Sequence, residues 1–205
     1  MNSGFRIAVT GGPGGGKTTA TDLFRRELGE EVVVVPEAAT LLFGGGFPRY
    51  AEPDAVRVAQ RVIFELQRGL EDTQRARYPS RILLCDRGTV DGAGYWPAGD
   101  PEDFFTSVGT SIEAEFARYD AVIFFQSAAV GGHAIEANNP VRTESNLEAA
   151  ELDARLHELW AGHRRFVLVP NNQSFFKKIT AGLSVLEEMV RELRSGPVTP
   201  APVPI

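Results

Sequence analysis

Short runs of branched apolar residues alternate along the chain with longer amphipathic segments. The apolar runs predict buried strands at residues 5–10, 31–37, 81–85, 120–126 and 165–170. Apolar positions spaced by three and four residues predict helices at residues 17–28, 53–78, 101–119, 144–163 and 176–193. Strands that alternate with helices in this way indicate an α/β fold, in which a parallel sheet carries helices on both faces.

The segments between these elements are consistent with a single domain. A chain of 205 residues suits one α/β domain, and we assign residues 1–194 to it. Residues 44–50 are predicted to form a loop, and residues 127–142 have no sustained period, which indicates a mobile loop before the next helix. Four prolines in residues 195–205 predict a flexible tail.

Charge and cysteine content narrow the possible partners and compartment. The formal net charge of −6 would repel a nucleic-acid duplex or an anionic membrane, so we expect neither as a partner. The single cysteine, Cys85, excludes an internal disulfide and is typical of a reducing compartment. A basic amino end leading into an apolar stretch and an apolar run of about 18 residues are both missing, so the sequence indicates neither a signal peptide nor a spanning helix. We therefore expect a cytoplasmic protein.

The stretch "TGGPGGGKTT" lies between the first predicted strand and the first predicted helix. It matches the P-loop (Walker A) pattern G-x-x-x-x-G-K-[ST] in the context that this motif requires. Glycines let the main chain wrap a polyphosphate, and the helix directs its free N–H groups at the same anion. A glycine-rich turn with a chance lysine is the alternative. The predicted nucleotide-binding residues are Gly11, Gly12, Pro13, Gly14, Gly15, Gly16, Lys17, Thr18 and Thr19.

Within this motif, Lys17 is expected to reach the β- and γ-phosphates, and Thr18 to bind Mg²⁺. Two further features bear on the nucleotide and the reaction. The guanine-specific N-K-x-D pattern does not follow the fourth or fifth strand, which favours ATP over GTP. Arg87 follows Asp86 where motor ATPases carry Asp-Glu, which favours phosphoryl transfer over hydrolysis.

The stretches "VVVVPEAA", "LLCDRGTVDGAGYW" and "NNPVRTES" carry a family resemblance. Over most of residues 5–194 the chain resembles the P-loop group that includes nicotinamide riboside kinase domains and related AAA-like ATP-binding proteins. Its order of elements is also similar to that of deoxynucleoside kinases. The resemblance implies a P-loop NTPase fold with strand order 2-3-1-4-5 and a lid at about residues 127–145. It also implies that Asp86 lies near Lys17 and Thr18, where it would hold Mg²⁺; capping of the next turn is the alternative.

The resemblance also suggests catalytic roles for other residues, so that the predicted catalytic set is Lys17, Glu37, Asp86, Arg87 and Arg142. Glu37, at the carboxyl end of the second strand, is the candidate general base; a helix-start carboxylate is the alternative. Arg87 would contact the substrate or the transferring phosphate, unless it forms a salt bridge at the sheet edge. Arg142 would bring charge to the γ-phosphate from the lid, although related lids often carry more than one arginine, and a surface position is the alternative.

Aromatic and polar residues follow the second and third strands in segments interpreted as loops. An aromatic ring stacks well on a nucleobase or nicotinamide, and Asp91 could accept hydrogen bonds from ribose hydroxyls. Packing against the core is the alternative for the aromatic residues. The candidate acceptor-binding residues are Phe43, Phe47, Arg49, Tyr50, Asp91, Tyr95 and Trp96.

Together these observations predict a phosphotransferase that uses ATP and Mg²⁺ to phosphorylate a hydroxyl of a small molecule, with a nucleoside or nucleotide as the expected acceptor. A nucleotide-binding regulatory switch without phosphotransfer is the main alternative, and an ATP-hydrolysing motor is the other.

Overall fold

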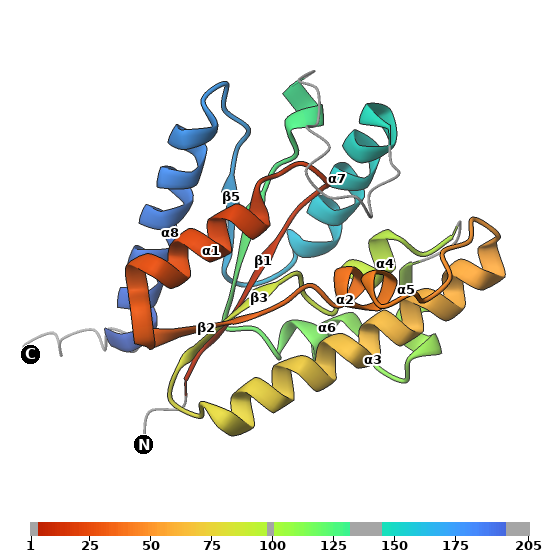
Figure 1. The fold of residues 1–205 in the computed structure, drawn as a ribbon, viewed down its shortest axis with the longest axis horizontal. Helices are drawn as coiled ribbons and strands as arrows, with labels where there is room; N and C mark the ends of the chain where they lie inside the picture. Colours follow the sequence, from red (N-terminus) through yellow and green to blue (C-terminus); the bar gives the residue numbers. More distant parts are fainter. Residues whose placement is uncertain (1–3, 98–100, 132–144, 196–205) are drawn as a thin grey trace, which may run out of the picture.

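In the computed structural model, which describes residues 4–97, 101–131 and 145–195, five parallel strands form one sheet (Figure 1). The strand order is β2-β3-β1-β4-β5, as the resemblance implied. The strands are β1 (Arg6–Thr10), β2 (Val32–Val35), β3 (Ile82–Asp86), β4 (Ala121–Phe125) and β5 (Phe166–Val169). All five were predicted within a few residues, because parallel strands covered on both faces read as continuous apolar runs.

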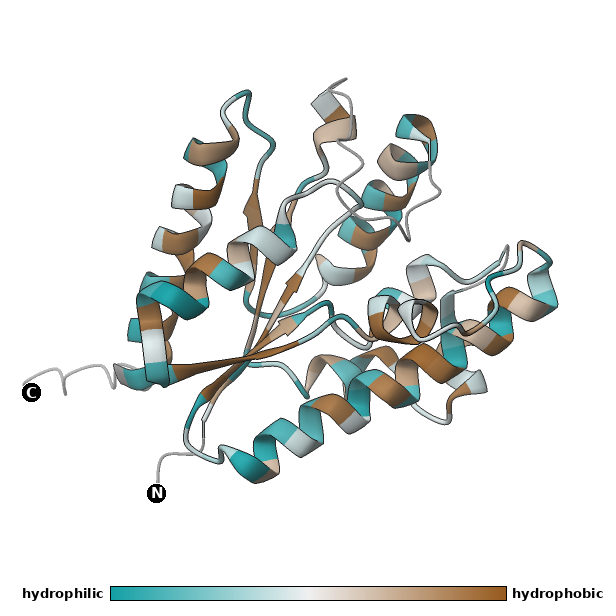
Figure 2. Cartoon of the chain, viewed as in Figure 1, coloured by the Kyte–Doolittle hydropathy of each residue, from teal (hydrophilic) through white to brown (hydrophobic). Residues whose placement is uncertain are grey.

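Helices cover both faces of the sheet, as predicted. On one face, α1 (Lys17–Leu28) and α8 (Phe175–Ser195) pack Phe24 and Leu186 against residues such as Ile7 of β1. The other face is covered by α3 (Pro53–Arg77), α5 (Pro101–Ser107), α6 (Ile112–Phe116) and α7 (Asn146–Trp160). Figure 2 shows hydrophobic residues along the strands and mixed polarity on the helices, as expected for helices that bury one side.

The strand register places the carboxyl ends of the central strands at one edge. Val9 pairs with Asp86, and Val35 pairs with Cys85, so the residues that follow β1 and β2 emerge next to the end of β3. Open parallel sheets bind ligands at this edge. The glycine-rich loop, Glu37 and Arg87 all follow these strand ends.

Three local elements differ from the sequence prediction. The expected single helix over 101–119 is wrong: it divides into α5 and α6, because Gly109 takes φ 70° and Ser111 caps α6. Helices α2 (Ala38–Gly44) and α4 (Asp91–Gly94) were not predicted, since seven and four residues are too few to show a helical period. Short 3₁₀ helices, η1 (Gly29–Glu31) and η2 (Ala128–Gly131), complete the described elements.

Part of the predicted lid and most of the tail, at residues 132–144 and 196–205, lie outside the described residues, and Arg142 is among them. Within the described ranges, none of the helices combines the length and apolar character needed to cross a membrane.

Candidate active site

The glycine-rich loop between β1 and α1 has the backbone geometry of a phosphate cradle. Gly11, Gly14 and Gly16 take φ values of 129°, 74° and 87°, which side chains rarely tolerate. At Gly11 an added Cβ would lie 2.1 Å from the main-chain oxygen of Phe125. Gly16 is the N-cap of α1 and has no side chain to cap the first turn; the N–H groups at such a helix start are typical anion-binding groups.

Lys17 begins α1 and turns its ammonium group into this loop. The side chain is 5% exposed, and Nζ donates hydrogen bonds of 2.8 Å to the main-chain oxygens of Gly11 and Gly12. The loop therefore holds a buried cation within the cradle, where a polyphosphate would compete with the two carbonyl groups for it.

Asp86 and Thr18 lie in contact, as the resemblance implied. Thr18 Oγ1 donates to Asp86 Oδ2 at 2.9 Å, whereas Asp86 Oδ1 is buried without a hydrogen-bond partner among the described residues. Burial, followed by the nearby charge of Glu37, raises the pKa of Asp86 to about 6. A carboxylate oxygen that is buried and unpaired is a group that a cation would stabilise.

These two side chains fit a magnesium ion. Mg²⁺ takes oxygen ligands and is held in nucleotide sites by one or two protein groups together with phosphates and water. Among the described residues there is no cluster of three or more His, Cys, Asp or Glu side chains that could hold a metal by itself. Asp86 and Thr18 would therefore share the ion with the nucleotide.

Substitution of Asp86 with asparagine tests the metal assignment. The variant keeps the shape of the side chain but removes its charge, so the gain in ATP affinity that Mg²⁺ produces should fall by about tenfold or more. Titration calorimetry of both proteins with ATP, in Mg²⁺ and in EDTA, measures this gain. In EDTA the variant should bind ATP at least as tightly as the wild type, because a charge that repels the phosphates is gone. An undiminished magnesium effect in the variant would assign the ion to other ligands.

Glu37 and Arg87 form an ion pair beside the cradle. Glu37 Oε1 accepts from Arg87 Nε at 2.5 Å, and Glu37 Oε2 accepts from Thr40 Oγ1 at 2.5 Å. Burial alone would raise the pKa of Glu37, but the charges of Arg87 and Lys17 and the Thr40 hydrogen bond together lower it below its ordinary value. Glu37 is thus ionised at neutral pH, as a base must be. Glu37 is also the N-cap of α2, so it stands at a helix start as the alternative to a general base proposed. Its side chain, however, makes no capping hydrogen bond.

Arg87 has the only positive φ, 75°, of any non-glycine residue in the described chain. Its guanidinium donates to Asp91 Oδ2 at 2.9 Å and to the main-chain oxygen of Gly11 at 3.3 Å. Its own N–H donates to the oxygen of Val9 at 3.0 Å. Arg87 therefore forms salt bridges, which was the alternative to a contact with substrate or phosphate. Through its hydrogen bonds it also connects the phosphate cradle to Glu37.

Gln67, in the middle of α3, connects the strand ends that carry Glu37 and Arg87. Its amide oxygen accepts from the N–H of Ala38 at 3.3 Å, and its amide nitrogen donates to the main-chain oxygen of Arg87 at 3.2 Å. The same nitrogen donates to buried Glu71 at 3.2 Å. One buried side chain thus positions the backbone next to both members of the ion pair.

Replacing Gln67 with methionine, which has a similar length, leaves these buried backbone groups without partners. Each buried group without a partner lowers the free energy of unfolding by about 1–3 kcal/mol. Because a loss of 1 kcal/mol lowers the midpoint of thermal unfolding by about 2–4 °C, the midpoint should fall by several degrees. Differential scanning calorimetry measures this change. Gln74→Met on the same helix is the matched control; an equal shift in both variants would show that helix α3, rather than the amide, accounts for the effect.

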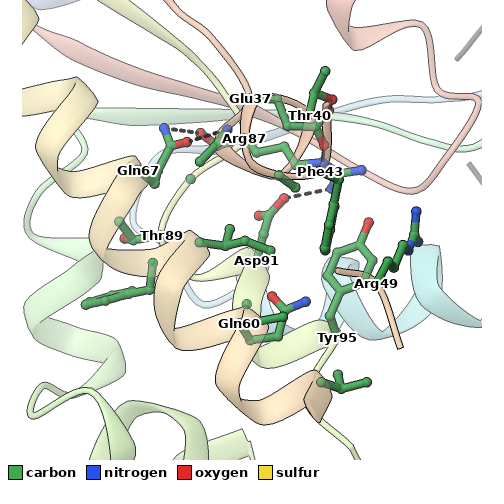
Figure 3. A pocket seen from close by; sticks show the side chains of 18 of the residues that line it. Glu37, Thr40, Phe43, Arg49, Gln60, Gln67, Arg87, Thr89, Asp91 and Tyr95 are labelled. Atoms are coloured by element: carbon green, nitrogen blue, oxygen red, sulfur yellow. Dashed lines mark hydrogen bonds and ion pairs between the residues drawn. The ribbon is translucent and has the colours of Figure 1, made fainter. Parts of the chain in front are cut away.

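A cavity of about 580 Å³ lies beside the Glu37–Arg87 pair. Residues of α2 and α3 form much of its lining. Figure 3 shows Glu37, Arg87 and Asp91 at one end, and Phe43, Arg49 and Tyr95 along the wall. Its volume lies within the range of about 300–1,000 Å³ that is typical of small-molecule sites. Of the predicted acceptor-binding residues, the lining includes Phe43, Arg49, Tyr50, Asp91 and Tyr95.

Two of the predicted acceptor-binding residues, Phe47 and Trp96, are not among the residues that line the cavity. Trp96 is 8% exposed and packs its ring edge-on against Phe104 in the core, 5.4 Å between centroids, rather than lining the cavity. Asp91 lines the cavity, but its oxygens accept from Thr10 at 2.8 Å and Trp160 at 2.6 Å in addition to Arg87. Asp91 therefore anchors Arg87, and its contact with a ribose hydroxyl stays a prediction. Phe43 and Asp91 also lie in helices α2 and α4, not in loops.

Asp153 of α7 was not predicted, although it contacts the cradle. Its Oδ1 accepts from the N–H groups of Gly12 and Ser127 at 2.8 Å each. A Cβ at Gly12 would lie 2.6 Å from Asp153 Cβ, so the glycine permits this contact. A signal was present in the sequence, because Asp153 occupies a buried position in the apolar spacing of α7 with Leu152 and Leu156.

Comparisons with known proteins agree with this fold. A family model described as an AAA domain matches residues 6–177. The fold is similar to deoxyadenosine kinase from M. mycoides with bound dATP, at 15% identity and a TM-score of 0.58, covering 89% of this chain and 99% of that one. It is also similar to thymidylate kinase from Candida albicans, at 11% identity and a TM-score of 0.64, covering 92% of this chain and 93% of that one. A search of curated protein sequences found no match.

Proposed function

We propose that this chain, which belongs to the AAA domain family and has the fold of P-loop kinases, is an ATP- and Mg²⁺-dependent phosphotransferase. Its acceptor is a hydroxyl group of a nucleoside or nucleotide. Structural similarity at 11–15% sequence identity supports the fold only. The proposed activity therefore rests on the residues of the site.

The observation that carries the proposal is that the phosphate cradle and the cavity meet at Arg87. The guanidinium reaches the oxygen of Gly11 in the cradle, and Arg87 also lines the cavity with Glu37 and Pro13. An acceptor in the cavity would therefore present its hydroxyl to the terminal phosphate of a nucleotide held by the loop. A switch protein has no need of such a second compartment.

The ionised side chains next to this junction have consistent roles in transfer. Glu37 would take the proton of the attacking hydroxyl group. At the same time the hydroxyl oxygen bonds to the γ-phosphorus, and the bond between the γ-phosphorus and the β-phosphate oxygen breaks, which releases ADP. Glu37 retains lone pairs for this beside its bonds to Arg87 and Thr40. Lys17 and Arg87 would stabilise charge on the transferring group. Magnesium, held by Asp86 and Thr18, would neutralise phosphate charge.

The lining of the cavity suits a flat, polar acceptor. Phe43, Tyr50 and Tyr95 offer aromatic surface for a base, and the amide of Gln60 offers both a donor and an acceptor of hydrogen bonds. The cationic residues among the described lining side chains are Arg49 and Arg87. With Arg87 assigned to the transferring phosphate, Arg49 would supply the positive charge for a phosphate on a nucleotide acceptor.

A product assay tests the proposal. Purified protein is incubated with ATP, Mg²⁺ and a panel that pairs each nucleoside with its 5′-monophosphate and includes nicotinamide riboside. We expect one member of the panel to gain a phosphate, detected by mass spectrometry, in amounts equal to the ADP formed. Tight ATP binding without a phosphorylated product in any reaction would reject the transferase and leave the nucleotide-dependent switch.

A further inference from the structure

We propose that Asp153 of α7 is a positioning residue for the two cations of the site, Lys17 and Arg87. Asp153 acts on them through the peptide group that joins Gly11 to Gly12. The inference rests on the proposed function only in that a nucleoside triphosphate occupies the cradle. It holds for a kinase and for a nucleotide-dependent switch alike.

One peptide group in the cradle connects Asp153 to both cations. The N–H of Gly12 donates to Asp153 Oδ1 at 2.8 Å. The carbonyl oxygen of the same peptide group, on Gly11, accepts from Lys17 Nζ at 2.8 Å and from Arg87 Nη1 at 3.3 Å. Because the described chain contains no cis peptide bond, this N–H and this carbonyl point in opposite directions. An anchor on the N–H therefore directs the carbonyl oxygen at the two cations.

This peptide group needs an anchor because a glycine lies on each side of it. Gly11 takes φ 129°, and neither glycine carries a Cβ that would restrict rotation of the peptide group. Rotation by half a turn would direct the N–H of Gly12 into the cradle and the carbonyl oxygen away from the cations. A phosphate that binds the cations competes with the carbonyl for them, so the hydrogen bond to Asp153 matters most when a nucleotide is bound.

Asp153 is itself held in a fixed position. The residue is 3% exposed, and the same Oδ1 also accepts from the N–H of Ser127, shortly after β4, at 2.8 Å. The hydroxyl of Ser127 donates to the main-chain oxygen of Pro13 at 2.5 Å, so the cradle is connected to this corner twice. A buried carboxylate oxygen with two N–H donors has a well-defined place, and through it α7 and the end of β4 fix the orientation of the cradle peptide.

The shared carbonyl brings the two cations to one point in the site. Lys17 and Arg87 donate to the same oxygen, so their charged groups lie close together and suit a single phosphate group. We have assigned both of them to the transferring phosphate. If the peptide group loses its anchor, the affinity contributed by the terminal phosphate should fall, whereas contacts with the rest of the nucleotide remain. The ratio of the dissociation constants of ADP and ATP measures this contribution.

The charge of Asp153 is an alternative explanation that can be separated from its hydrogen bonds. Burial raises the pKa of Asp153, and the charges of Lys17 and Lys178 act against this rise, so the carboxylate also interacts with nearby cations. Asparagine keeps an oxygen that can accept from both N–H groups but carries no charge. Glutamate keeps the charge but displaces its oxygens by one methylene group.

The experiment measures the dissociation constants of ADP and ATP, both in Mg²⁺, by titration calorimetry of the wild type, Asp153→Ala, Asp153→Asn and Asp153→Glu. We expect the ratio of the ADP constant to the ATP constant to fall about tenfold in Asp153→Ala and Asp153→Glu, because the terminal phosphate loses charge-assisted contacts. Asp153→Asn should keep the wild-type ratio. Each ratio compares two ligands on the same binding-competent protein, so it does not depend on how much of a variant is folded.

Leu152→Ala is the matched control. Leu152 is the neighbouring residue of α7, is 3% exposed and packs in the core rather than against the cradle. Its substitution should lower the midpoint of thermal unfolding and leave the ratio of the two dissociation constants unchanged.

Three results would overturn the inference. Equal losses of ATP and ADP affinity in Asp153→Ala would show that Asp153 merely supports the fold of the loop. A lowered ratio in Asp153→Asn with a wild-type ratio in Asp153→Glu would assign the effect to charge, and these two variants decide the question even where Asp153→Ala does not fold. Equal affinity of the wild type for ADP and ATP would show that the cations do not act on the terminal phosphate. The expected ratios in a protein that forms no phosphorylated product would support the positioning role and reject only the proposed transfer.

Discussion

Replacing Lys17 with alanine should abolish nucleotide-dependent activity, with a fall in turnover of about 10²–10³-fold or more, and should remove stabilisation by ATP. Lys17 supplies the ammonium group in the cradle, where its Nζ lies 2.8 Å from the oxygens of Gly11 and Gly12. Its loss leaves the loop itself without a positive charge for the phosphates. Thermal-shift measurements with and without ATP and Mg²⁺, together with the product assay, measure both effects.

Lys177→Ala provides the control for this substitution. Lys177 is exposed on α8, so the control removes the same charge from the protein without touching the cradle. It should leave ATP stabilisation and turnover unchanged. If Lys17→Ala matched wild type in both measurements, the loop would not be the phosphate site, and the kinase proposal and its switch alternative would fail together.

Replacing Glu37 with glutamine should leave ATP binding intact and lower turnover by about 10²-fold or more. The amide is nearly the same size as the carboxylate but cannot accept a proton from the attacking hydroxyl. The ion pair with Arg87 is also lost, although the amide oxygen can still accept the hydrogen bond from Nε. Steady-state kinetics and ATP calorimetry on the same preparation separate the two effects.

Glu52→Gln is a matched control because it tests the helix-start alternative directly. Glu52 is the N-cap of α3 as Glu37 is the N-cap of α2, and neither side chain makes a capping bond. Glu52 is exposed and lies outside the lining of the cavity. If helix-start charge were the whole role of Glu37, the two variants would behave alike; a general base predicts that only Glu37→Gln loses turnover.

Local pattern was sufficient for the strands, the long helices and the phosphate cradle. Each depends on residues that are close together along the chain: apolar runs for the strands, three- and four-residue spacing for the helices, and adjacent glycines before Lys17 for the loop. The proximity of Asp86 to Thr18 required more, since the pairing of β1 with β3 brings them together. The sequence indicated that pairing only through a family resemblance.

The acceptor cavity shows where local pattern stops. Its walls come from α2, α3, α4 and the end of β3, and a short helix such as α2 leaves no periodic signal. The packing of these elements placed Trp96 in the core and gave the oxygens of Asp91 to Thr10, Trp160 and Arg87. Residues that are close together in the sequence therefore lie partly in the cavity wall and partly in the core. Tertiary packing decides between the two, and the sequence positions do not predict it.

Buried polar residues could be predicted only in part from the sequence. Gln67 and Asp153 occupy buried positions in the periods of α3 and α7, so the spacing alone marks them as polar groups that must find partners. The sequence by itself thus determined the fold class, the cradle and the presence of such groups, because these follow from short-range spacing. Only the tertiary structure decided which backbone groups they bind, because these contacts join elements that are distant in the chain.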